Sequence, residues 1–375
     1  MIDFNKVAIL GNELEYVRQT FENNHLSGDG PFTKKCHAYF QDTLGVGKAL
    51  LTTSCTHALE MAAILLNLEP GDEIIAPSFT FVSTINAFLL HGAKPVLVDV
   101  RPDTLNMDEH LLEERITERT KAIVPVHYAG VACEMDQVRQ IANKYNLLII
   151  EDNAHGLFSK YKGQYLGTLG SFAAQSFHET KNITCGEGGA LFINDPAFIE
   201  RAEIIREKGT DRSRFFRGMI DKYTWVDIGS SYIPSEILAA VLFAQLEKAT
   251  LIQQRRRLIW DQYNQHLADW AITNGFRLPV IPDECEQSYH MFYLLAPDLE
   301  VRTRFIKTLR EKQIYSVFHY LPLHLSQMGI SMGGLPGDCP VTERVSDQLI
   351  RLPLNNSMGL DDVEQVLEVI LNFQS

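Results

Sequence analysis

The chain has 375 residues, which is long enough for one large domain and a second, smaller one. Its composition, with 45% hydrophobic and 22% charged residues, excludes disordered and fibrous proteins. The net charge of −13 disfavours nucleic acids and anionic membranes as partners, and the longest purely apolar run, Ile237 to Ala244, is far shorter than the roughly 18 residues that span a bilayer.

The segment from residue 48 to residue 152 alternates short β-rich runs with helical stretches. Strands are predicted at Lys48–Thr53, Glu73–Ala76, Pro95–Val100, Lys121–Val126 and Leu147–Glu151, and helices at Thr56–Leu68, Thr80–Leu90, Asp108–Thr117 and Met135–Tyr145. One strand and one helix recur about every 25 residues, a spacing typical of βα units. Because such units set successive strands in one direction, we expect a mainly parallel central sheet.

The pattern changes after residue 152. We expect short strands at Phe172–Phe177 and Ala190–Asn194, a helix at Ala197–Lys208 and, after the charged, aromatic stretch 212–232, a long amphipathic helix at Ser235–Ala268. Further strands are predicted at Met291–Leu295 and Tyr315–Phe318, and helices at Val301–Lys312, Thr342–Ile350 and Leu360–Leu371. The sequence therefore predicts an α/β protein with a large domain at residues 1–250, including an N-terminal segment 1–35, and a small α+β domain at residues 251–375.

Two charged residues are expected at the edge of the sheet. Asp152 follows the apolar run 147–150, so it is predicted at the carboxyl end of a buried strand, where open α/β sheets bind ligands. An acid at such a place is, by itself, more often a helix cap or a loop hydrogen-bonding group than a catalytic one. Lys181 follows another predicted strand and precedes the glycines at residues 186–189. A lysine brought to the interior edge of a sheet needs a partner or a reaction.

A third element, Ser54-Cys55-Thr56-His57-Ala58, leads from a predicted strand directly into a helix. Small hydroxyl side chains and free backbone N–H groups at a helix N-terminus form a phosphate site. A phosphate site, a strand-end carboxylate and a lysine are together what pyridoxal 5′-phosphate needs, because the carboxylate keeps the pyridine nitrogen protonated and the lysine forms the Schiff base and moves protons. Phe81, after the next strand, either covers the cofactor ring or packs in the core.

Other kinds of site find less support. The glycines at 28–30 and 186–189 lack the spacing and context of a dinucleotide-binding turn, and neither a nucleophile elbow nor a Walker A motif is present. Asp152 with His155, and His319 with His324, do not have the spacing of standard metal sites, so no metal is expected. Six scattered cysteines without a CxxC pair, and an N-terminus without an apolar signal core, predict a reduced, cytoplasmic protein.

Four motifs carry a resemblance that covers essentially the whole chain. They are Glu151-Asp152-Asn153-Ala154-His155, Ser176-Phe177-His178-Glu179-Thr180-Lys181-Asn182, Gly186-Glu187-Gly188-Gly189 and His319-Tyr320-Leu321-Pro322-Leu323-His324. Together they resemble the DegT/DnrJ/EryC1/StrS family of sugar aminotransferases. Two longer stretches, 124–136 and 206–232, are similar to the branch of this family that makes dTDP-4-amino-4,6-dideoxygalactose.

The resemblance implies a PLP-dependent transferase fold of type I, as in aspartate aminotransferase, with pyridoxal 5′-phosphate as the cofactor and a homodimer whose active sites lie at the subunit interface. Lys181 matches the Schiff-base lysine, and Asp152 matches the partner of the pyridinium nitrogen. The other implied cofactor contacts are His155 near the phenolic oxygen, Phe81 on the ring, and Cys55, Thr56 and Ser176 at the phosphate.

Two positions depart from the family pattern. Many relatives have Gly-x-Asn before the long helix, and that asparagine reaches the phosphate of the neighbouring subunit. This chain has Gly229-Ser230-Ser231 there, so Ser231 stands at the position of the asparagine with a shorter side chain. Cys55 replaces the glycine that is common in the family. A contact between the phosphate and the backbone N–H of this residue is still possible after that change.

The implied reaction moves an amino group from L-glutamate to C4 of dTDP-4-dehydro-6-deoxy-D-glucose. Its products are dTDP-4-amino-4,6-dideoxy-D-galactose and 2-oxoglutarate, for a surface polysaccharide such as enterobacterial common antigen or an O-antigen. A sugar nucleotide needs cations near its pyrophosphate, and the basic stretch 208–222 either lines that site or is a solvated loop. The expected substrate contacts are Lys208, Arg212, Arg214, Lys222, Tyr232, His319, Tyr320 and His324.

Two other functions stay open at this point. One is a transaminase that makes the gluco epimer, or that acts at C3 of a related nucleotide sugar. The epimer needs only that the sugar bind in a flipped orientation, so that its reacting carbon is protonated on the other face. The other is a non-catalytic sensor that binds pyridoxal phosphate without turnover, although no helix-turn-helix or basic segment supports a DNA-binding regulator. Lys181 argues against the sugar dehydratases of the family, which typically have histidine at its position.

Overall fold

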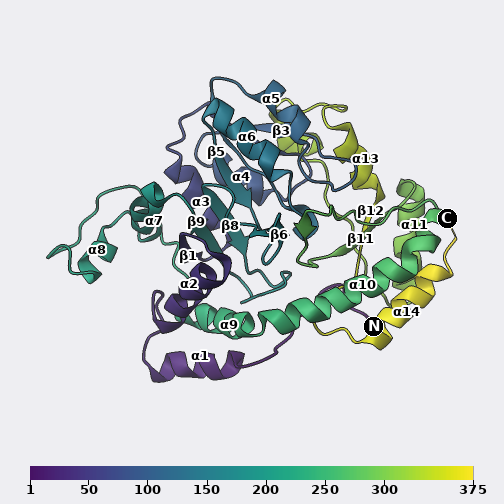
Figure 1. Ribbon diagram of the computed structural model, residues 1–375, viewed down its shortest axis with the longest axis horizontal. Helices are drawn as coiled ribbons and strands as arrows, with labels where there is room; N and C mark the ends of the chain where they lie inside the picture. Colours follow the sequence, from purple (N-terminus) through teal and green to yellow (C-terminus); the bar gives the residue numbers. More distant parts are fainter. Residues whose placement is uncertain (375) are drawn as a thin grey trace.

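A seven-stranded sheet forms the centre of the computed structural model, which describes residues 1–374 (Figure 1). Its strands are β1 (Lys48–Thr52), β2 (Glu73–Pro77), β3 (Lys94–Val98), β4 (Thr120–Ile123), β5 (Leu148–Asp152), β8 (Phe172–Ser176) and β9 (Gly189–Ile193). They lie in the order β1-β9-β8-β5-β4-β2-β3. Strand β9 pairs antiparallel with both of its neighbours, and all the other pairings are parallel. The prediction of a mainly parallel central sheet is confirmed.

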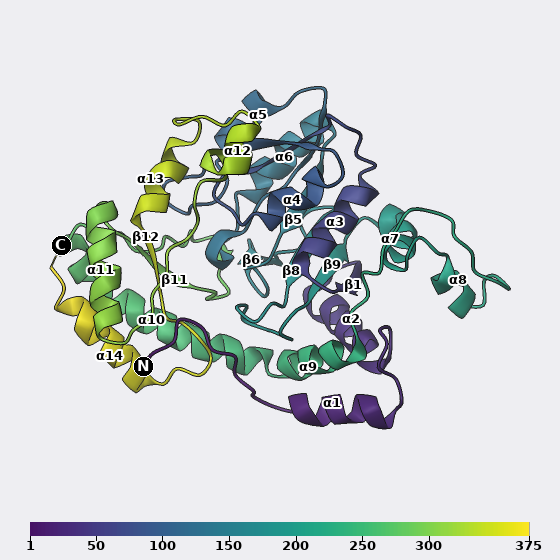
Figure 2. The same cartoon turned by 180° about the vertical axis from the view of Figure 1, so that it is seen from behind.

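Helices cover both faces of this sheet (Figures 1 and 2). They include α3 (Cys55–Leu65), α4 (Ser83–Leu89), α5 (Leu112–Arg115), α6 (Met135–Tyr145) and α7 (Ile199–Arg206). On one face, Leu59 of α3 shares an apolar core with Leu191 of β9, and on the other, Val138 of α6 shares a core with Ile149 of β5. The buried strands are therefore held from both sides, and the loops after their carboxyl ends are fixed in place.

Two helices that the sequence pattern did not indicate, α1 (Glu13–Glu22) and α2 (Pro31–Leu44), pack with α9 (Glu236–Glu247) below the sheet in Figure 1. The buried carboxylate of Glu236 accepts hydrogen bonds from the backbone N–H groups of Gly30, Phe32 and Thr33 at 3.1, 2.8 and 2.9 Å. These groups form the start of α2, where the helix dipole stabilises an anion. Glu236 thereby ties the N-terminal segment to α9.

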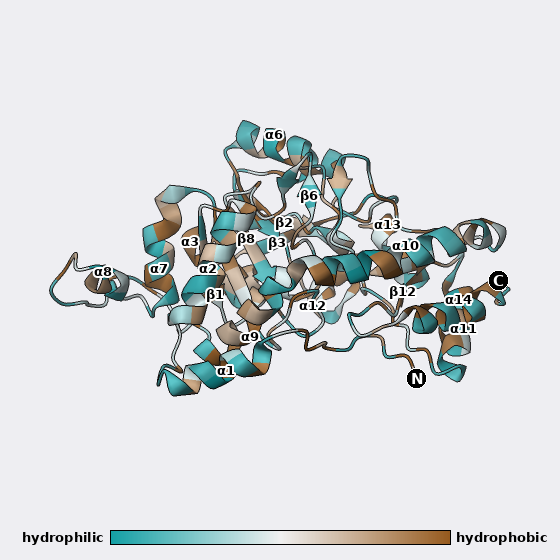
Figure 3. Cartoon of the chain, turned by 60° about the horizontal axis from the view of Figure 1, so that its bottom comes forward, coloured by the Kyte–Doolittle hydropathy of each residue, from teal (hydrophilic) through white to brown (hydrophobic). Residues whose placement is uncertain are grey.

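The long helix expected at Ser235–Ala268 is in fact two helices. Helix α9 ends at Glu247, Lys248 has φ −103° and ψ 8°, and α10 (Ala249–Thr273) then continues beyond the predicted end. Figure 3 shows that α9 is largely hydrophobic, whereas α10 alternates between hydrophobic and hydrophilic residues as it runs to the C-terminal region. No helix within residues 1–374 has the combination of length and hydropathy that a membrane-spanning helix requires.

The C-terminal region is built around a two-stranded sheet. Its elements are β11 (Phe292–Leu295), β12 (Leu349–Leu352), α11 (Leu299–Glu311), α12 (Gln327–Ser331), α13 (Pro340–Gln348) and α14 (Leu360–Leu371). The apolar core of this region also contains Ile2, whose backbone pairs with Gln313 and Tyr315 at N–O distances of 2.9 and 3.0 Å. The first residues of the chain thus pack with the C-terminal region, whereas the rest of segment 1–35, including Tyr16 and Phe32, packs on the large domain as expected.

Smaller elements complete the fold. A three-stranded sheet in the order β10-β6-β7 joins β6 (Lys160–Tyr161) and β7 (Gln164–Tyr165) of the large domain to β10 (Cys285–Glu286). Helix α8 (Arg212–Phe216) lies on an arm that projects from the body of the molecule in Figures 1 and 2. The arm corresponds to the charged, aromatic stretch for which the sequence predicted no regular structure.

Two predictions for the C-terminal region are wrong. Apart from isolated bridges at Ile314 and Val317, residues 314–318 join no sheet in the described chain, so Tyr315–Phe318 is not a strand. Helix α13 ends at Gln348 rather than at Ile350, because residues 349–352 pair with β11. In the second case, pairing with a distant segment overrides the local pattern.

Candidate active site

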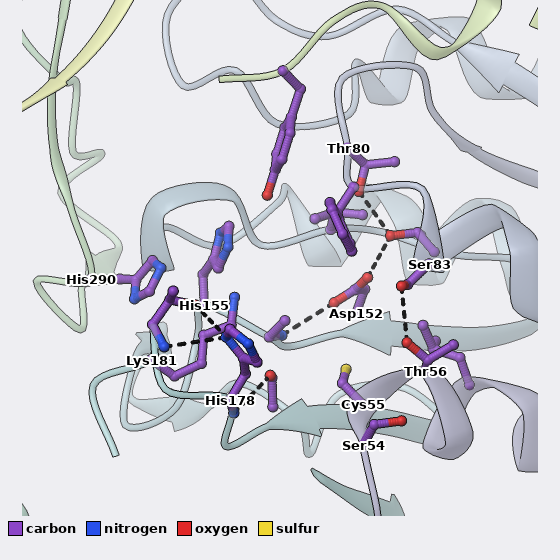
Figure 4. A pocket seen from close by; sticks show the side chains of 18 of the residues that line it. Ser54, Cys55, Thr56, Thr80, Ser83, Asp152, His155, His178, Lys181 and His290 are labelled. Atoms are coloured by element: carbon purple, nitrogen blue, oxygen red, sulfur yellow. Dashed lines mark hydrogen bonds between the residues drawn. The ribbon is translucent and has the colours of Figure 1, made fainter. Parts of the chain in front are cut away.

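A cavity of about 600 Å³ lies where the carboxyl ends of the parallel strands meet the C-terminal region. Its large-domain wall, as we call it, contains residues 54–56 after β1, residues 80, 81, 83 and 84 after β2, Asp152 and Lys181. Its C-terminal wall consists of His290, His319, Tyr320 and Arg351. Figure 4 shows Asp152 between the hydroxyl groups of Thr56 and Ser83 on one side and the amine of Lys181 on the other.

Asp152 is the last residue of β5 and is only 6% exposed. Its Oδ2 accepts a hydrogen bond from the Thr84 hydroxyl (2.7 Å), and its Oδ1 accepts one from the backbone N–H of Ala154 (3.2 Å). Because side chains alternate along a strand, the preceding Glu151 points to the other face. There its carboxylate accepts hydrogen bonds from three backbone N–H groups of loop 167–170. Of these two neighbouring carboxylates, only Asp152 lines the cavity.

Lys181 lies in the turn after β8, where its backbone N–H donates to the carbonyl of His178 (2.9 Å). Its amine faces the cavity, and it forms no hydrogen bond or ion pair with residues 1–374 of the chain. Burial lowers the pKa of Lys181 to about 8, and the nearby Cys55 and Asp152 oppose this shift. A part of the amine is therefore unprotonated, and nucleophilic, near neutral pH.

The N-terminus of α3 faces the same cavity. The Ser54 hydroxyl caps the helix by accepting a hydrogen bond from the N–H of His57 (3.1 Å), and the Thr56 hydroxyl donates to Ser83 (2.9 Å). The free N–H groups of the first turn attract an anion. A Cβ atom at Gly189 would lie 2.3 Å from the carbonyl carbon of Ser54, so this glycine allows β9 to pass directly beside the helix start. Its role is close packing and not a dinucleotide turn.

His155 stacks on His290, with ring centroids 4.3 Å apart. Burial, together with the charges of Lys181 and Arg351, lowers the pKa of both imidazoles well below the ordinary value, so both are neutral at physiological pH. The Nδ1 atom of His155 is buried and has no hydrogen-bond partner in the described chain. Because buried polar atoms are rarely left unpaired, a bound molecule is the expected partner.

These residues fit pyridoxal 5′-phosphate. Asp152 would hold the proton of the pyridine nitrogen, Lys181 would bind the aldehyde carbon, and His155 Nδ1 would meet the phenolic oxygen. The start of α3, with Thr56 and Ser176, suits the phosphate. Two further predicted contacts line the cavity: Cys55, whose thiol is kept neutral because burial raises its pKa well above the ordinary value, and Phe81, which is 56% exposed.

Several cavity residues were not predicted from the sequence. Thr84 lies in the hydroxyl-rich run 78–84 after a strand, and this run is a signal that could have indicated it. His290 and Arg351 carry no local signal, since they reach the cavity through the packing of the C-terminal region. The other lining residues with polar side chains to which the sequence assigned no role are Thr80, Ser83, His178, Thr180 and Glu187.

The basic stretch that was expected near the pyrophosphate lies on the arm around α8, and it does not line the cavity of its own chain (Figure 1). Most of its cations pair with acids in or next to α7. The ion pairs are Lys208 and Arg212 with Glu207, Arg214 with Glu200, and Arg217 with Glu203, with N–O distances of 2.8–3.4 Å. Lys222 and Ser231 are exposed, and neither reaches this cavity.

The other expected substrate contacts divide into two groups. His319 and Tyr320 line the cavity, whereas Tyr232 and His324 do not. Tyr232 is buried beside α3, where its hydroxyl donates to a carboxylate of that helix (3.4 Å). The His324 ring is buried and hydrogen bonded to Ser78 (2.7 Å) and to a carboxylate of α13 (2.9 Å). Their polar groups are satisfied within the chain, so both residues have a packing role instead of the expected substrate contact.

Comparisons with known proteins agree with this description of the site. The sequence model of the DegT/DnrJ/EryC1/StrS aminotransferase family matches residues 8–371. The chain is 36% identical to the uncharacterized protein MJ1066 of Methanocaldococcus jannaschii (91% of this chain, 89% of that protein) and 32% identical to GDP-perosamine synthase of Caulobacter vibrioides (96% and 95%).

Solved structures show the same fold. The aminotransferase TlmJ of Streptoalloteichus hindustanus superposes with a TM-score of 0.90 at 31% identity, covering 99% of this chain and 98% of TlmJ. Spr1654 of Streptococcus pneumoniae, in its PLP form, superposes with a TM-score of 0.90 at 28% identity, covering 98% and 97%. The fold is therefore that of PLP-dependent sugar aminotransferases, as expected from the resemblance.

Proposed function

Because the chain belongs to the DegT/DnrJ/EryC1/StrS aminotransferase family, we propose that it is the sugar aminotransferase that aminates C4 of dTDP-4-dehydro-6-deoxy-D-glucose. The cofactor is pyridoxal 5′-phosphate. The amino donor is L-glutamate, and the products are dTDP-4-amino-4,6-dideoxy-D-galactose and 2-oxoglutarate. The observation that carries this proposal is the meeting of Lys181, Asp152 and the start of α3 in one cavity.

Each of the cavity residues has a separate role in the proposed reaction. When bound, the cofactor supplies an electron sink for the electrons left on carbon when a proton departs. Nζ of Lys181 takes the proton from Cα of the amino donor, a role that suits an amine whose pKa is about 8. Asp152 holds the proton on the pyridine nitrogen, and Thr84 fixes one carboxylate oxygen for that purpose. In the second half of the reaction, Lys181 delivers the proton to C4 of the sugar.

The sugar and its nucleotide are proposed on sequence similarity. Stretches 124–136 and 206–232 resemble the branch of the family that makes the 4-amino-4,6-dideoxygalactose product. Relatives carry names such as GDP-perosamine synthase and spore coat polysaccharide biosynthesis protein SpsC of Bacillus subtilis. These names support amination of a nucleotide sugar for a surface polysaccharide, and they do not identify which sugar is the substrate.

We further propose that the protein is a homodimer in which the arm around α8 reaches the cavity of the second subunit. The arm exposes large aromatic side chains, with Phe216 70% and Trp225 77% exposed, and such surfaces mark protein–protein contacts. It also carries Ser231 and Lys222, two predicted contacts that do not reach the cavity of their own chain. In such a dimer, the predicted phosphate and pyrophosphate contacts would lie beside the substrate of the second subunit.

The first experiment is the visible absorbance spectrum of the purified protein before and after addition of L-glutamate. We expect a yellow protein that bleaches, because glutamate passes its amino group to the cofactor. The keto sugar nucleotide should then restore the yellow colour, and NMR of the product should show an axial amine at C4.

Other outcomes correct specific parts of the proposal. An equatorial amine at C4 would establish the gluco epimer as the product, and an amine at C3 would establish a transaminase that acts at C3 of the sugar. A yellow protein that no amino acid bleaches would indicate a sensor that binds the cofactor without turnover. A protein that stays colourless with added pyridoxal phosphate would contradict the assigned roles of Asp152 and Lys181.

A further inference from the structure

Arg351 is a cation of the cavity that has no counter-ion in the part of the chain that the structure describes. It lies on β12 and lines the cavity together with His319 and Lys181. Its Nη1 donates a hydrogen bond to Nε2 of His319 (3.1 Å), its Nε is buried without a partner, and it pairs with no carboxylate in residues 1–374. Removal from solvent lowers the pKa of the guanidinium, yet arginine stays protonated at physiological pH. Unpaired buried cations are costly, so the protein is expected to use this one.

The position of Arg351 is fixed by two segments that are distant from it in the sequence. Its backbone N–H donates to the carbonyl of Val317 (2.7 Å), and its guanidinium lies 4.6 Å from the centre of the Phe4 ring. Phe4 is held in turn because Asn355 donates to the carbonyl of Asp3 (3.1 Å). The N-terminal residues thus form one side of the arginine's site. This support orients the guanidinium and supplies no negative charge to it.

The histidine beside Arg351 cannot supply a negative charge either. A guanidinium only donates hydrogen bonds, so Nε2 of His319 is the acceptor. The proton of the neutral ring is therefore on Nδ1, which donates to the hydroxyl oxygen of Tyr128 (3.1 Å). Burial, together with Arg351, lowers the pKa of His319 well below the ordinary value. The C-terminal wall consequently carries the positive charge of Arg351 and no negative charge.

We propose that Arg351 binds a carboxylate of the amino donor, an inference that rests on the proposed aminotransferase function. The planar fork of a guanidinium matches a carboxylate with two parallel hydrogen bonds. The carboxylate bonded to the donor's Cα must enter the cavity when Lys181 reaches that carbon. In the sugar nucleotide, the pyrophosphate is attached to C1, on the far side of the sugar ring from the reacting C4. Arg351 is therefore a donor-binding residue, and the arm around α8 is left for the pyrophosphate.

The test separates the two halves of the reaction. Absorbance titrations give the affinity of the yellow form for L-glutamate, L-aspartate and L-alanine in wild type and in Arg351→Gln and Arg351→Lys. We expect Arg351→Gln to weaken the binding of the accepted amino acid about 10- to 100-fold, the effect of losing hydrogen bonds between charged groups. Arg351→Lys should recover part of the loss, because it keeps the charge without the fork. The rate with the keto sugar nucleotide should fall far less.

Arg256 provides a matched control. It is also a buried arginine, but it donates to the carbonyl oxygens of Tyr289, His290 and Leu354 at 2.9, 2.5 and 3.2 Å, and it does not line the cavity. Arg256→Met should therefore lower Tm and leave donor affinity within about threefold of wild type. Arg351→Met should leave Tm unchanged or raise it, because an unpaired charge is removed. This readout does not depend on activity.

Each outcome decides between the two proposals. Equal donor affinity in wild type and Arg351→Gln overturns the role of Arg351 and leaves the aminotransferase function intact. An equal loss in both halves of the reaction, or a fall in Tm in Arg351→Met as large as in Arg256→Met, also overturns it, because either result indicates a structural arginine. If no amino acid bleaches the wild-type protein, the proposed function fails and the role of Arg351 fails with it.

Discussion

The large-domain wall of the cavity balances its charges, whereas the C-terminal wall leaves a cation unpaired. On the large-domain wall, Asp152 is hydrogen bonded to Thr84 and opposes the lowering of the Lys181 pKa. On the C-terminal wall, Arg351 faces the neutral imidazole of His319. A balanced wall suits a cofactor that stays bound between reactions, and an unbalanced wall suits an anion that arrives and leaves. Variants of the two walls are therefore expected to fail in different ways.

Removing the amine of Lys181 should have the largest effect. In Lys181→Ala we expect turnover to fall about 10⁴-fold or more, since a positioned proton-transfer group alone contributes about 10²- to 10⁴-fold and the covalent attachment of the cofactor is lost as well. Steady-state assays with donor and sugar nucleotide measure this fall. Tm of the cofactor-free protein is the control, and it should not drop, because the amine has no partner in the described chain. A variant that retains a tenth of the wild-type rate would refute the role of Lys181.

Changing the charge of Asp152 should have the next largest effect on turnover. Asp152→Asn keeps a side chain of the same shape that can still accept from Thr84, but it loses the negative charge that holds a proton on the ring nitrogen. We expect kcat to fall about 10²- to 10³-fold, a range typical of removing one electrostatic group from an active site. Donor affinity belongs to the C-terminal wall and should change little. A large rise in the donor Kd with normal kcat would break the proposed division between the walls.

The neighbouring Glu151 is the matched control for Asp152, because the same strand presents it to the opposite face. Both of its carboxylate oxygens accept backbone hydrogen bonds from loop 167–170, at 2.7–2.8 Å. In Glu151→Gln, the amide NH₂ must face one of these N–H groups in either orientation. We expect the free energy of unfolding to fall by about 2 to 4 kcal/mol in denaturant titrations. The folded fraction should keep a normal kcat, and a loss of kcat without loss of stability would contradict this reading.

The large-domain wall was predictable from sequence because its groups sit at junctions that local patterns mark. Asp152 ends an apolar run, Thr56 begins a helix directly after a strand, and Lys181 follows a short strand. The same patterns predicted all seven strands of the central sheet. They did not indicate that the helix at Ser235–Ala268 is interrupted at Lys248, or that residues 13–44 contain two helices. Those features depend on packing between α1, α2 and α9, which no single window of sequence contains.

The C-terminal wall was not predictable in the same way. Arg351 stands in a short run whose first residues, 349 and 350, were assigned to the end of a helix, and it becomes a cavity residue only when β12 pairs with β11. Its contacts, Phe4 and His319, lie far from it in the sequence. The motif at residues 319–324 was singled out through the resemblance, and two of its residues, His319 and Tyr320, line the cavity. A site assembled from distant segments therefore needs the structure.

The pH dependence of cofactor uptake tests the charges of both walls together. The pKa of Lys181 is lowered to about 8, so its amine is mostly unprotonated above that pH and mostly protonated below it. The rate at which cofactor-free protein takes up pyridoxal phosphate should rise about tenfold per pH unit up to pH 8 and then level off. Stopped-flow absorbance measures it. A second rise in this rate near pH 6.5 would contradict the neutral state of His155, His290 and His319, because the pKa values of all three are well below the ordinary value.

The smallest expected effect comes from Thr84, which only orients a reacting group. Its hydroxyl donates to Oδ2 of Asp152 (2.7 Å), so the hydroxyl of Thr80, 2.8 Å away, must donate to Thr84. Thr84→Val removes the middle of this chain, and one buried hydrogen bond is worth about 0.5 to 1.5 kcal/mol, or roughly two- to tenfold in kcat. Thr84→Ser keeps the hydroxyl and should restore the rate. Because Thr84 belongs to the large-domain wall, the donor Kd should stay constant in both variants, and a change in the Kd alone would show that the two walls are not independent.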